Sequence, residues 1–253
     1  MNRSTAESLS KVPEVTLLFW LIKIAATTLG ETGGDAVSMS MNLGYLVGTA
    51  IFAVVFVIAV AVQIRWKGFH PFIYWTAIIA TTTVGTTMAD FADRSLGIGY
   101  LGGSLLLFSL LIASLATWYW VMGSVSIRTV ISPKVEIFYW VTIMFSQTLG
   151  TALGDWTADT AGLGYTGGAM VFCGLLAVVA GGYYWTRISR TALFWAAFVL
   201  TRPLGAVVGD FLDKPISAGG LDLSRYSATL ALLAFMIACI IVFPQRAAKG
   251  AGH

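Results

Sequence analysis

Four copies of one short motif place carboxylates inside segments that are otherwise apolar enough for a membrane. The copies are TTLGETGGD (27–35), TTVGTTMAD (82–90), QTLGTALGD (147–155) and RPLGAVVGD (202–210). Each ends in an aspartate five residues after its first glycine, namely Asp35, Asp90, Asp155 and Asp210. Ionisable side chains at membrane depth are costly and normally mark an ion path, a proton relay or an ion pair. The motif therefore predicts a polar site within a membrane protein.

On a helix, the positions three before, one after and five after that first glycine share a face, because they are four residues apart. Three of the resulting stripes are rich in oxygen, and the fourth carries an arginine: Thr27/Glu31/Asp35, Thr82/Thr86/Asp90, Gln147/Thr151/Asp155 and Arg202/Ala206/Asp210. Pairs of small residues beside the stripes allow helices to approach closely: Gly30/Gly34, Gly85/Ala89, Gly150/Gly154 and Gly205/Gly209. We expect close packing of these four helices to bring the four aspartates together.

Carboxylates crowded in one pocket repel, so a proton or a metal ion is needed to supply positive charge. The expected metal ligands are Glu31, Asp35, Asp90, Asp155 and Asp210. The expected lining residues are Thr27, Thr82, Thr86, Gln147, Thr151, Arg202, Asp93, Asp159 and Asp213. Oxygen ligands without thiolate or imidazole favour hard divalent ions, above all Mn²⁺ or Mg²⁺.

Two basic residues fall within the apolar segments and need separate interpretations. Arg202 either neutralises an aspartate structurally or acts as an internal cation that competes with the bound ion. Lys23 stands three residues after Trp20 and is expected to extend its amine to the membrane interface. Trp20 and its counterparts Trp75, Trp140 and Trp195 each lie ten residues before a motif glycine, which suits an interfacial belt.

Composition indicates an all-α integral membrane protein. Apolar residues make up 57% of the 253, charged residues 11%, and the mean hydropathy is +0.82. Unbroken apolar runs such as IFAVVFVIAVAV argue against a β-barrel, whose strands would alternate. Eight segments of about 20 residues are long enough to cross the bilayer: 14–35, 45–64, 71–90, 100–122, 135–155, 164–186, 191–210 and 226–243.

Lysines and arginines predict the orientation. Ten flank one side of the predicted helices: Arg3, Lys11, Arg65, Lys67, Arg128, Lys134, Arg187, Arg190, Arg246 and Lys249. Only Arg94, Lys214 and Arg225 flank the other. Positive charge is retained on the cytoplasmic side, so both termini are expected there. The first segment has no small-x-small cleavage site and carries the same motif as three later helices, so it is expected to stay uncleaved. Two cysteines (Cys173, Cys239) and two histidines (His70, His253) lie too far apart in the sequence for a disulfide framework or a Cys/His metal site.

The motif glycines Gly30, Gly85, Gly150 and Gly205 are separated by 55, 65 and 55 residues, so the first two repeats map onto the last two with a shift of 120. We expect one membrane domain over 1–253, with helical-hairpin repeats at approximately 13–66, 70–124, 133–187 and 188–246. Each hairpin crosses twice, so all four copies enter in the same direction. The pseudo-rotational axis should then run along the membrane normal, unlike that of inverted repeats.

The four G-x-x-x-[GA]-D motifs and their upstream tryptophans resemble a bacterial family of tandem membrane repeats known as uncharacterised membrane-anchored proteins. The resemblance covers nearly the whole chain. It implies repeated hairpins in a bacterial inner membrane, and it implies no activity.

From the residues we expect a multi-pass inner-membrane transporter or channel for a hard divalent cation with proton coupling, and not an enzyme. Its partners would be the cation, protons and the lipid bilayer. Scattered basic residues give no support for nucleic-acid binding, and the sequence leaves a homo-oligomer open. Two alternatives stay open: a non-transporting scaffold or sensor in which the repeats serve packing, and an intramembrane acid-dyad or metal-dependent enzyme.

Overall fold

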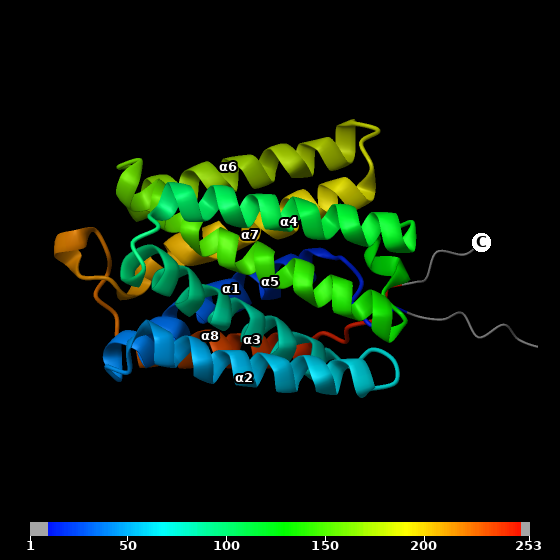
Figure 1. The fold of residues 1–253 in the computed structure, drawn as a ribbon, viewed down its shortest axis with the longest axis horizontal. Helices are drawn as coiled ribbons and strands as arrows, with labels where there is room; N and C mark the ends of the chain where they lie inside the picture. The colour runs from blue at the N-terminus through cyan, green and yellow to red at the C-terminus, as the bar shows by residue number, and fades with distance from the viewer. Residues whose placement is uncertain (1–9, 249–253) are drawn as a thin grey trace, which may run out of the picture.

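The computed structural model describes residues 10–248, which form an all-helical bundle (Figure 1). Its eight long helices are α1 (Leu17–Asp35), α2 (Gly44–Arg65), α3 (Pro71–Asp90), α4 (Tyr100–Met122), α5 (Pro133–Asp155), α6 (Gly164–Trp185), α7 (Arg190–Asp213) and α8 (Arg225–Val242). The eight helices predicted from apolar runs are confirmed, with ends that agree to within three residues. Arg3, Lys249 and His253 lie outside the described residues.

Five of the helices in this part of the chain are long and apolar enough to cross a membrane: α2, α4, α6, α7 and α8. The even-numbered helices expose most of their large apolar side chains, including Leu46, Val57 and Leu105. Such surfaces on long helices indicate a membrane protein. The polar motifs lower the hydropathy of α1, α3 and α5.

The odd-numbered helices form a closed ring. Helix α1 packs against α3 and α7, and α5 packs against the same two helices from the other side. The motif-bearing halves of these helices are almost entirely buried, whereas α2 buries only Gly48, Ala59 and Gln63. The prediction that the odd helices line a central region with the even helices outside is confirmed.

Each even-numbered helix packs mainly on the odd helix of the next repeat. Helix α2 lies on α3, α4 on α5 and α6 on α7, and α8 closes the circle on α1. Figure 1 shows the α8–α1 pairing as red beside dark blue. In the first three repeats the odd helix ends in a five-residue π-helical turn before its even partner: Ala36–Ser40, Phe91–Ser95 and Trp156–Thr160. Every repeat is therefore completed by its neighbour.

The motif glycines allow the ring to close. A Cβ atom added to Gly30 or Gly205 would collide with the side chain of Thr82 or Thr27, which is the first stripe residue of the neighbouring odd helix. A Cβ atom at Gly150 would likewise collide with the side chain of Arg202, and one at Gly85 would lie 3.0 Å from the backbone of Gln147. Each first glycine thus receives a stripe residue from the next helix, as expected for small residues at helix contacts.

Four aromatic pairs, Phe19–Trp20, Tyr74–Trp75, Tyr139–Trp140 and Phe194–Trp195, fill the end of the ring opposite the aspartates. The first ring of each pair touches the tryptophan of the next repeat, with centroid distances of 5.5 Å (Phe19–Trp75), 5.9 Å (Tyr74–Trp140), 6.2 Å (Tyr139–Trp195) and 5.9 Å (Phe194–Trp20). We call these eight side chains the aromatic ring. The expected interfacial belt is wrong for Trp75, Trp140 and Trp195, which are buried because they pack between helices.

Candidate functional site

The four motif aspartates lie together at one end of the odd-helix ring, which we call the acidic end. Asp35, Asp90, Asp155 and Asp210 are the last or nearly the last α-helical residues of their helices, and all are buried. Their convergence follows from the ring, because each stands at the same register and on the same face of its helix. The aromatic ring lies about 24 Å away, since Phe19 precedes Asp35 by sixteen helical residues.

Two basic side chains bridge these aspartates in pairs. Arg94 lies 2.9 Å from Asp90 and 3.4 Å from Asp155. Lys214 contacts Asp35 and lies 3.0 Å from Asp210. Each bridging residue stands four positions after one aspartate and reaches the aspartate of an adjacent odd helix.

One turn further into the ring, Arg202 of α7 reaches all three of the other odd helices. Its Nη2 donates to Glu31 Oε2 (3.0 Å), to Thr86 Oγ1 (2.6 Å) and to Thr151 Oγ1. Those three residues occupy the middle stripe positions of α1, α3 and α5, and Arg202 itself is fully buried. A single guanidinium that touches three helices must lie close to the axis of the ring.

Glu31 connects the two levels of charge. One of its oxygens lies within 4.8 Å of oxygens from Asp35 and Asp90, and the same limit holds for Glu31 with Asp155 and Asp210. The five carboxylates expected as metal ligands are therefore brought together. Carboxylates at these separations could share protons or bind a hard cation through oxygen.

The remaining stripe residues are buried below this level. Thr27 Oγ1 donates to the carbonyl of Thr201 at 3.1 Å. Neither Thr82 Oγ1 nor the side-chain amide of Gln147 has a hydrogen-bond partner among the described residues. The stripes therefore continue as a polar lining for about two turns inward from the aspartates.

Lys23 lies one turn beyond Thr27, away from the aspartates. The prediction that its amine reaches the membrane interface is wrong. The side chain is fully buried, and its Nζ lies 4.2 Å from the centre of the Phe198 ring on α7. The amine packs against the face of this aromatic side chain. Lys23 points into the ring because it continues the stripe of Thr27, Glu31 and Asp35 at four-residue spacing.

Three further aspartates, Asp93, Asp159 and Asp213, follow a motif aspartate by three or four residues and lie in three different environments. Asp213 is buried and is paired with Arg225 at 3.1 Å. Asp93 is buried against Gly103 of α4, where neither carboxylate oxygen has a hydrogen-bond partner in the described part of the chain. Asp159 is exposed and accepts a hydrogen bond of 3.5 Å from Tyr100. Only Asp213 adjoins the acidic cluster, with an oxygen within 4.8 Å of those of Asp35 and Asp210.

Arg94, Lys214 and Arg225 also belong to the site, although in the sequence they indicate only topology, as charges outside the membrane. A signal was present for two of them: Arg94 and Lys214 each follow a motif aspartate by four residues and are 120 positions apart. Repeat-related basic residues at helical spacing from an acid indicate ion pairs.

At the acidic end, burial and neighbouring charges shift the pKa values of side chains in opposite directions. Burial lowers the pKa of Arg94, but Asp90 and Asp155 raise it further, so the guanidinium stays charged. Lys214 is held charged in the same way, with burial opposed by Asp210 and Asp35. Asp93 has no such compensation, and burial raises its pKa to about 6 despite the neighbouring Arg94.

Comparison with known proteins supports the repeat architecture. A family described as a repeat of unknown function (DUF347) matches four successive segments: 18–69, 73–124, 138–189 and 193–245. The chain belongs to this family. Each segment begins on an odd helix and ends just after an even one, so the repeating unit of DUF347 carries one acidic motif and one aromatic pair. No curated protein and no solved structure matches the chain.

Proposed function

We propose that this protein transports a hard divalent cation across a bacterial inner membrane in exchange for protons, with the acidic end of the ring as its binding site. One observation carries the proposal. Six carboxylates gather at the acidic end when Asp213 is counted, whereas four basic residues in the described part of the chain pair with them: Arg94, Arg202, Lys214 and Arg225. Two negative charges are left over, which is the charge that one divalent cation or two protons would neutralise.

The ligand chemistry supports the same class of ion. Apart from Ala206, every stripe side chain offers oxygen or, in Arg202, a basic nitrogen, and the two cysteines lie elsewhere, on α6 and α8. Oxygen donors suit Mn²⁺ or Mg²⁺ better than Zn²⁺ or Cu⁺. Coupling to protons follows because the cation and the protons compete for the same carboxylate oxygens.

The orientation rests on charge. Lys11, Arg65, Lys67, Arg128 and Lys134 all flank the aromatic end of the helices. Under the positive-inside rule this end, with both termini, faces the cytoplasm, and the acidic end faces outward. All eight helices then cross the membrane, the polar stripes of α1, α3 and α5 being shielded from lipid by the even helices.

A second candidate is a non-transporting scaffold, and one observation favours it. Every one of the five carboxylates already has a basic partner within 4.0 Å in the protein. Buried ion pairs of this kind can fix which helices adjoin without binding any ligand. The two candidates predict different effects of neutralising a carboxylate. The transporter should lose cation binding, whereas the scaffold should lose only stability.

Calorimetric titration of the purified protein with Mn²⁺ and Mg²⁺ tests the proposal. Asp35→Asn and Asp155→Asn remove one ligand charge each, and we expect the affinity to fall by about tenfold or more, equivalent to about 1.4 kcal/mol. Asp159→Asn is the matched control, since it makes the same change four residues beyond Asp155 at an exposed position. Binding should also weaken as the pH falls, because protons and metal compete.

Arg202→Gln should have the opposite effect on cation affinity. Removing this buried positive charge leaves a third negative charge in the cluster, so cation binding should tighten. Uptake of the ion into liposomes completes the test. If the asparagine variants bind and transport like the parent protein and only lose thermal stability, the carboxylates are structural and the scaffold is correct.

A further inference from the structure

The polar lining of the odd-helix ring ends at the aromatic ring. One turn beyond Lys23, away from the aspartates, the same four helix faces carry Phe19, Tyr74, Tyr139 and Phe194. All four side chains are buried. Tyr74 and Tyr139, on the neighbouring helices α3 and α5, are joined by a hydrogen bond of 2.7 Å between their hydroxyls. Apolar constrictions of this kind stop ions by excluding water. The aromatic ring therefore closes the axis at the end away from the aspartates.

Two terminal segments cross this end and pair with each other. Residues 10–14 and 244–248 run antiparallel, with hydrogen bonds from Glu14 N to Arg246 O (2.8 Å) and from Ala248 N to Val12 O (2.9 Å). We call this pair of segments the terminal strap. Lys11 anchors it to two helices, through Glu136 of α5 (2.6 Å) and the carbonyl of Ile64 on α2 (2.9 Å).

The terminal strap is bonded directly to the aromatic ring. Trp75 Nε1 donates to Gln245 Oε1 at 2.8 Å. Trp75 in turn contacts Phe19, so one side-chain bond links the C-terminal arm of the strap to two ring members. Movement of this arm away from the bundle must break the bond and leave the indole without its acceptor.

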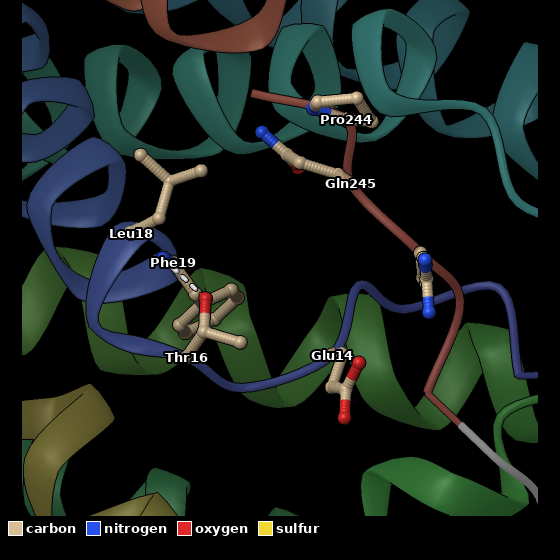
Figure 2. Close-up of a pocket in the computed structure, with 7 residues that line it drawn as sticks. Glu14, Thr16, Leu18, Phe19, Pro244 and Gln245 are labelled. Carbon is tan, nitrogen blue, oxygen red and sulfur yellow. Dashed lines mark hydrogen bonds between the residues drawn. The ribbon is translucent and has the colours of Figure 1, made fainter.

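A cavity of about 280 Å³ separates the strap from the beginning of α1. Figure 2 shows Glu14 and Thr16 on one side, Gln245 on the other and Phe19 at its edge. Phe19 thus belongs both to the wall of this cavity and to the aromatic ring. The cavity is large enough for several water molecules and has polar groups to bind them. This cavity therefore ends at the aromatic ring, with Phe19 between the two.

We propose that the terminal strap is the latch of a gate formed by the aromatic ring: release of Gln245 frees Trp75 and Phe19, and the cavity then joins the polar stripes. This inference rests on the proposed transport function and names the part of the protein that controls it. With the latch closed, the carboxylate cluster exchanges with the acidic end only. With the latch open, it exchanges with the cavity.

A reversible cross-link tests the latch. Pro13 and Ala247 face each other as the non-hydrogen-bonded pair of the strap, where Cα atoms lie about 4.5 Å apart, close enough for a disulfide. We would place Pro13→Cys and Ala247→Cys together in a chain carrying Cys173→Ser and Cys239→Ala. Each single replacement in the same background is the control for the cysteines themselves.

Oxidation of the double variant should reduce Mn²⁺ uptake into liposomes by about tenfold or more, as expected when an obligatory opening step is blocked. Reduction should restore uptake, and calorimetric Mn²⁺ binding at the acidic end should stay unchanged in both forms. Equal uptake by oxidised and reduced protein would overturn the latch while leaving the transport proposal intact. If the reduced protein carries no flux, the transport proposal fails.

A labelling experiment decides the latch without any flux. The thiol of a Phe19→Cys variant should react slowly with a water-soluble maleimide while the strap is closed. Adding Gln245→Ala should raise that rate about fivefold, the factor expected for loss of one buried hydrogen bond. Adding Thr186→Ala, which removes a side-chain hydrogen bond of 2.6 Å to the carbonyl of Gly182 and none to the strap, should leave the rate unchanged. Equal rates with and without Gln245 would overturn the proposal.

Discussion

Arg94 and Lys214 occupy equivalent places in the two halves of the chain, 120 residues apart, and each bridges a pair of aspartates across a helix–helix contact. Arg94 joins α3 to α5, and Lys214 joins α7 to α1. The two bridges are related by the internal duplication, so the acidic end has approximate two-fold symmetry in its ion pairs. The arginine and the lysine therefore perform the same structural task.

Arg94→Gln should lower the free energy of unfolding by about 2 kcal/mol, because Asp90 and Asp155 both lose their nearest positive charge in a buried setting. Arg94→Lys should cost much less, since Lys214 already shows that an ammonium can bridge two aspartates here. Thermal or chemical unfolding in detergent measures both variants. Equal losses for the two substitutions would show that the bridging charge contributes nothing.

Gly150→Ala should destabilise the protein by about 1–3 kcal/mol, because the added methyl group would overlap the side chain of Arg202. Gly174→Ala on α6 is the matched control. No atom lies within 4 Å of a Cβ built at Gly174, so this variant should be as stable as the parent or slightly more stable. The same unfolding assay compares the two variants. A stable Gly150→Ala protein would contradict the packing described for the ring.

Tyr139→Phe should cost about 1–3 kcal/mol, since it leaves the Tyr74 hydroxyl buried without its partner. Removing both hydroxyls, in Tyr74→Phe with Tyr139→Phe, should recover most of that loss. A double-mutant cycle of unfolding free energies measures the coupling. Additive losses would show that the two hydroxyls do not depend on each other.

Asp93 should make the protein less stable as the pH rises from about 4 to 6. Folding raises its pKa to about 6, so the folded state holds the proton more tightly than the unfolded chain does. The stabilisation from the protonated form is thus present below the unfolded pKa and is lost as the pH passes the folded value. Asp93→Asn should remove this component, which is measured as the difference between its pH–stability curve and that of the parent. Parallel curves would show that Asp93 titrates normally.

The helix count, the ring of odd helices and the convergence of the four aspartates could be predicted because they depend on repeated local patterns. Apolar length predicts each helix, and a shared register places Asp35, Asp90, Asp155 and Asp210 at one level of whatever surface the helices share. The small residues at Gly30 and its counterparts indicated that this surface is a close helix contact. These properties need no knowledge of the connecting segments.

The misread residues are those whose surroundings come from another repeat. Trp75 and Trp140 have the spacing of interfacial residues, but the preceding repeat supplies Phe19 and Tyr74 to cover them. Lys23 is near the predicted membrane boundary in its own helix, yet Phe198 of the last odd helix lies beside its amine. A pattern within one helix does not contain the partner that the ring brings to it.

Because α8 of the last repeat packs on α1 of the first, and the strap joins the two ends of the described chain, the order of the repeats is set by the peptide links and not by the packing. Moving the chain ends to the connection between α4 and α5, and joining the present ends with a short linker, should give a circular permutant with the same bundle. A chain of only two repeats would expose the flank of its first odd helix and the unpaired side of its last even helix. Two such halves fit each other, so a half-length protein would be expected to assemble as a head-to-tail pair.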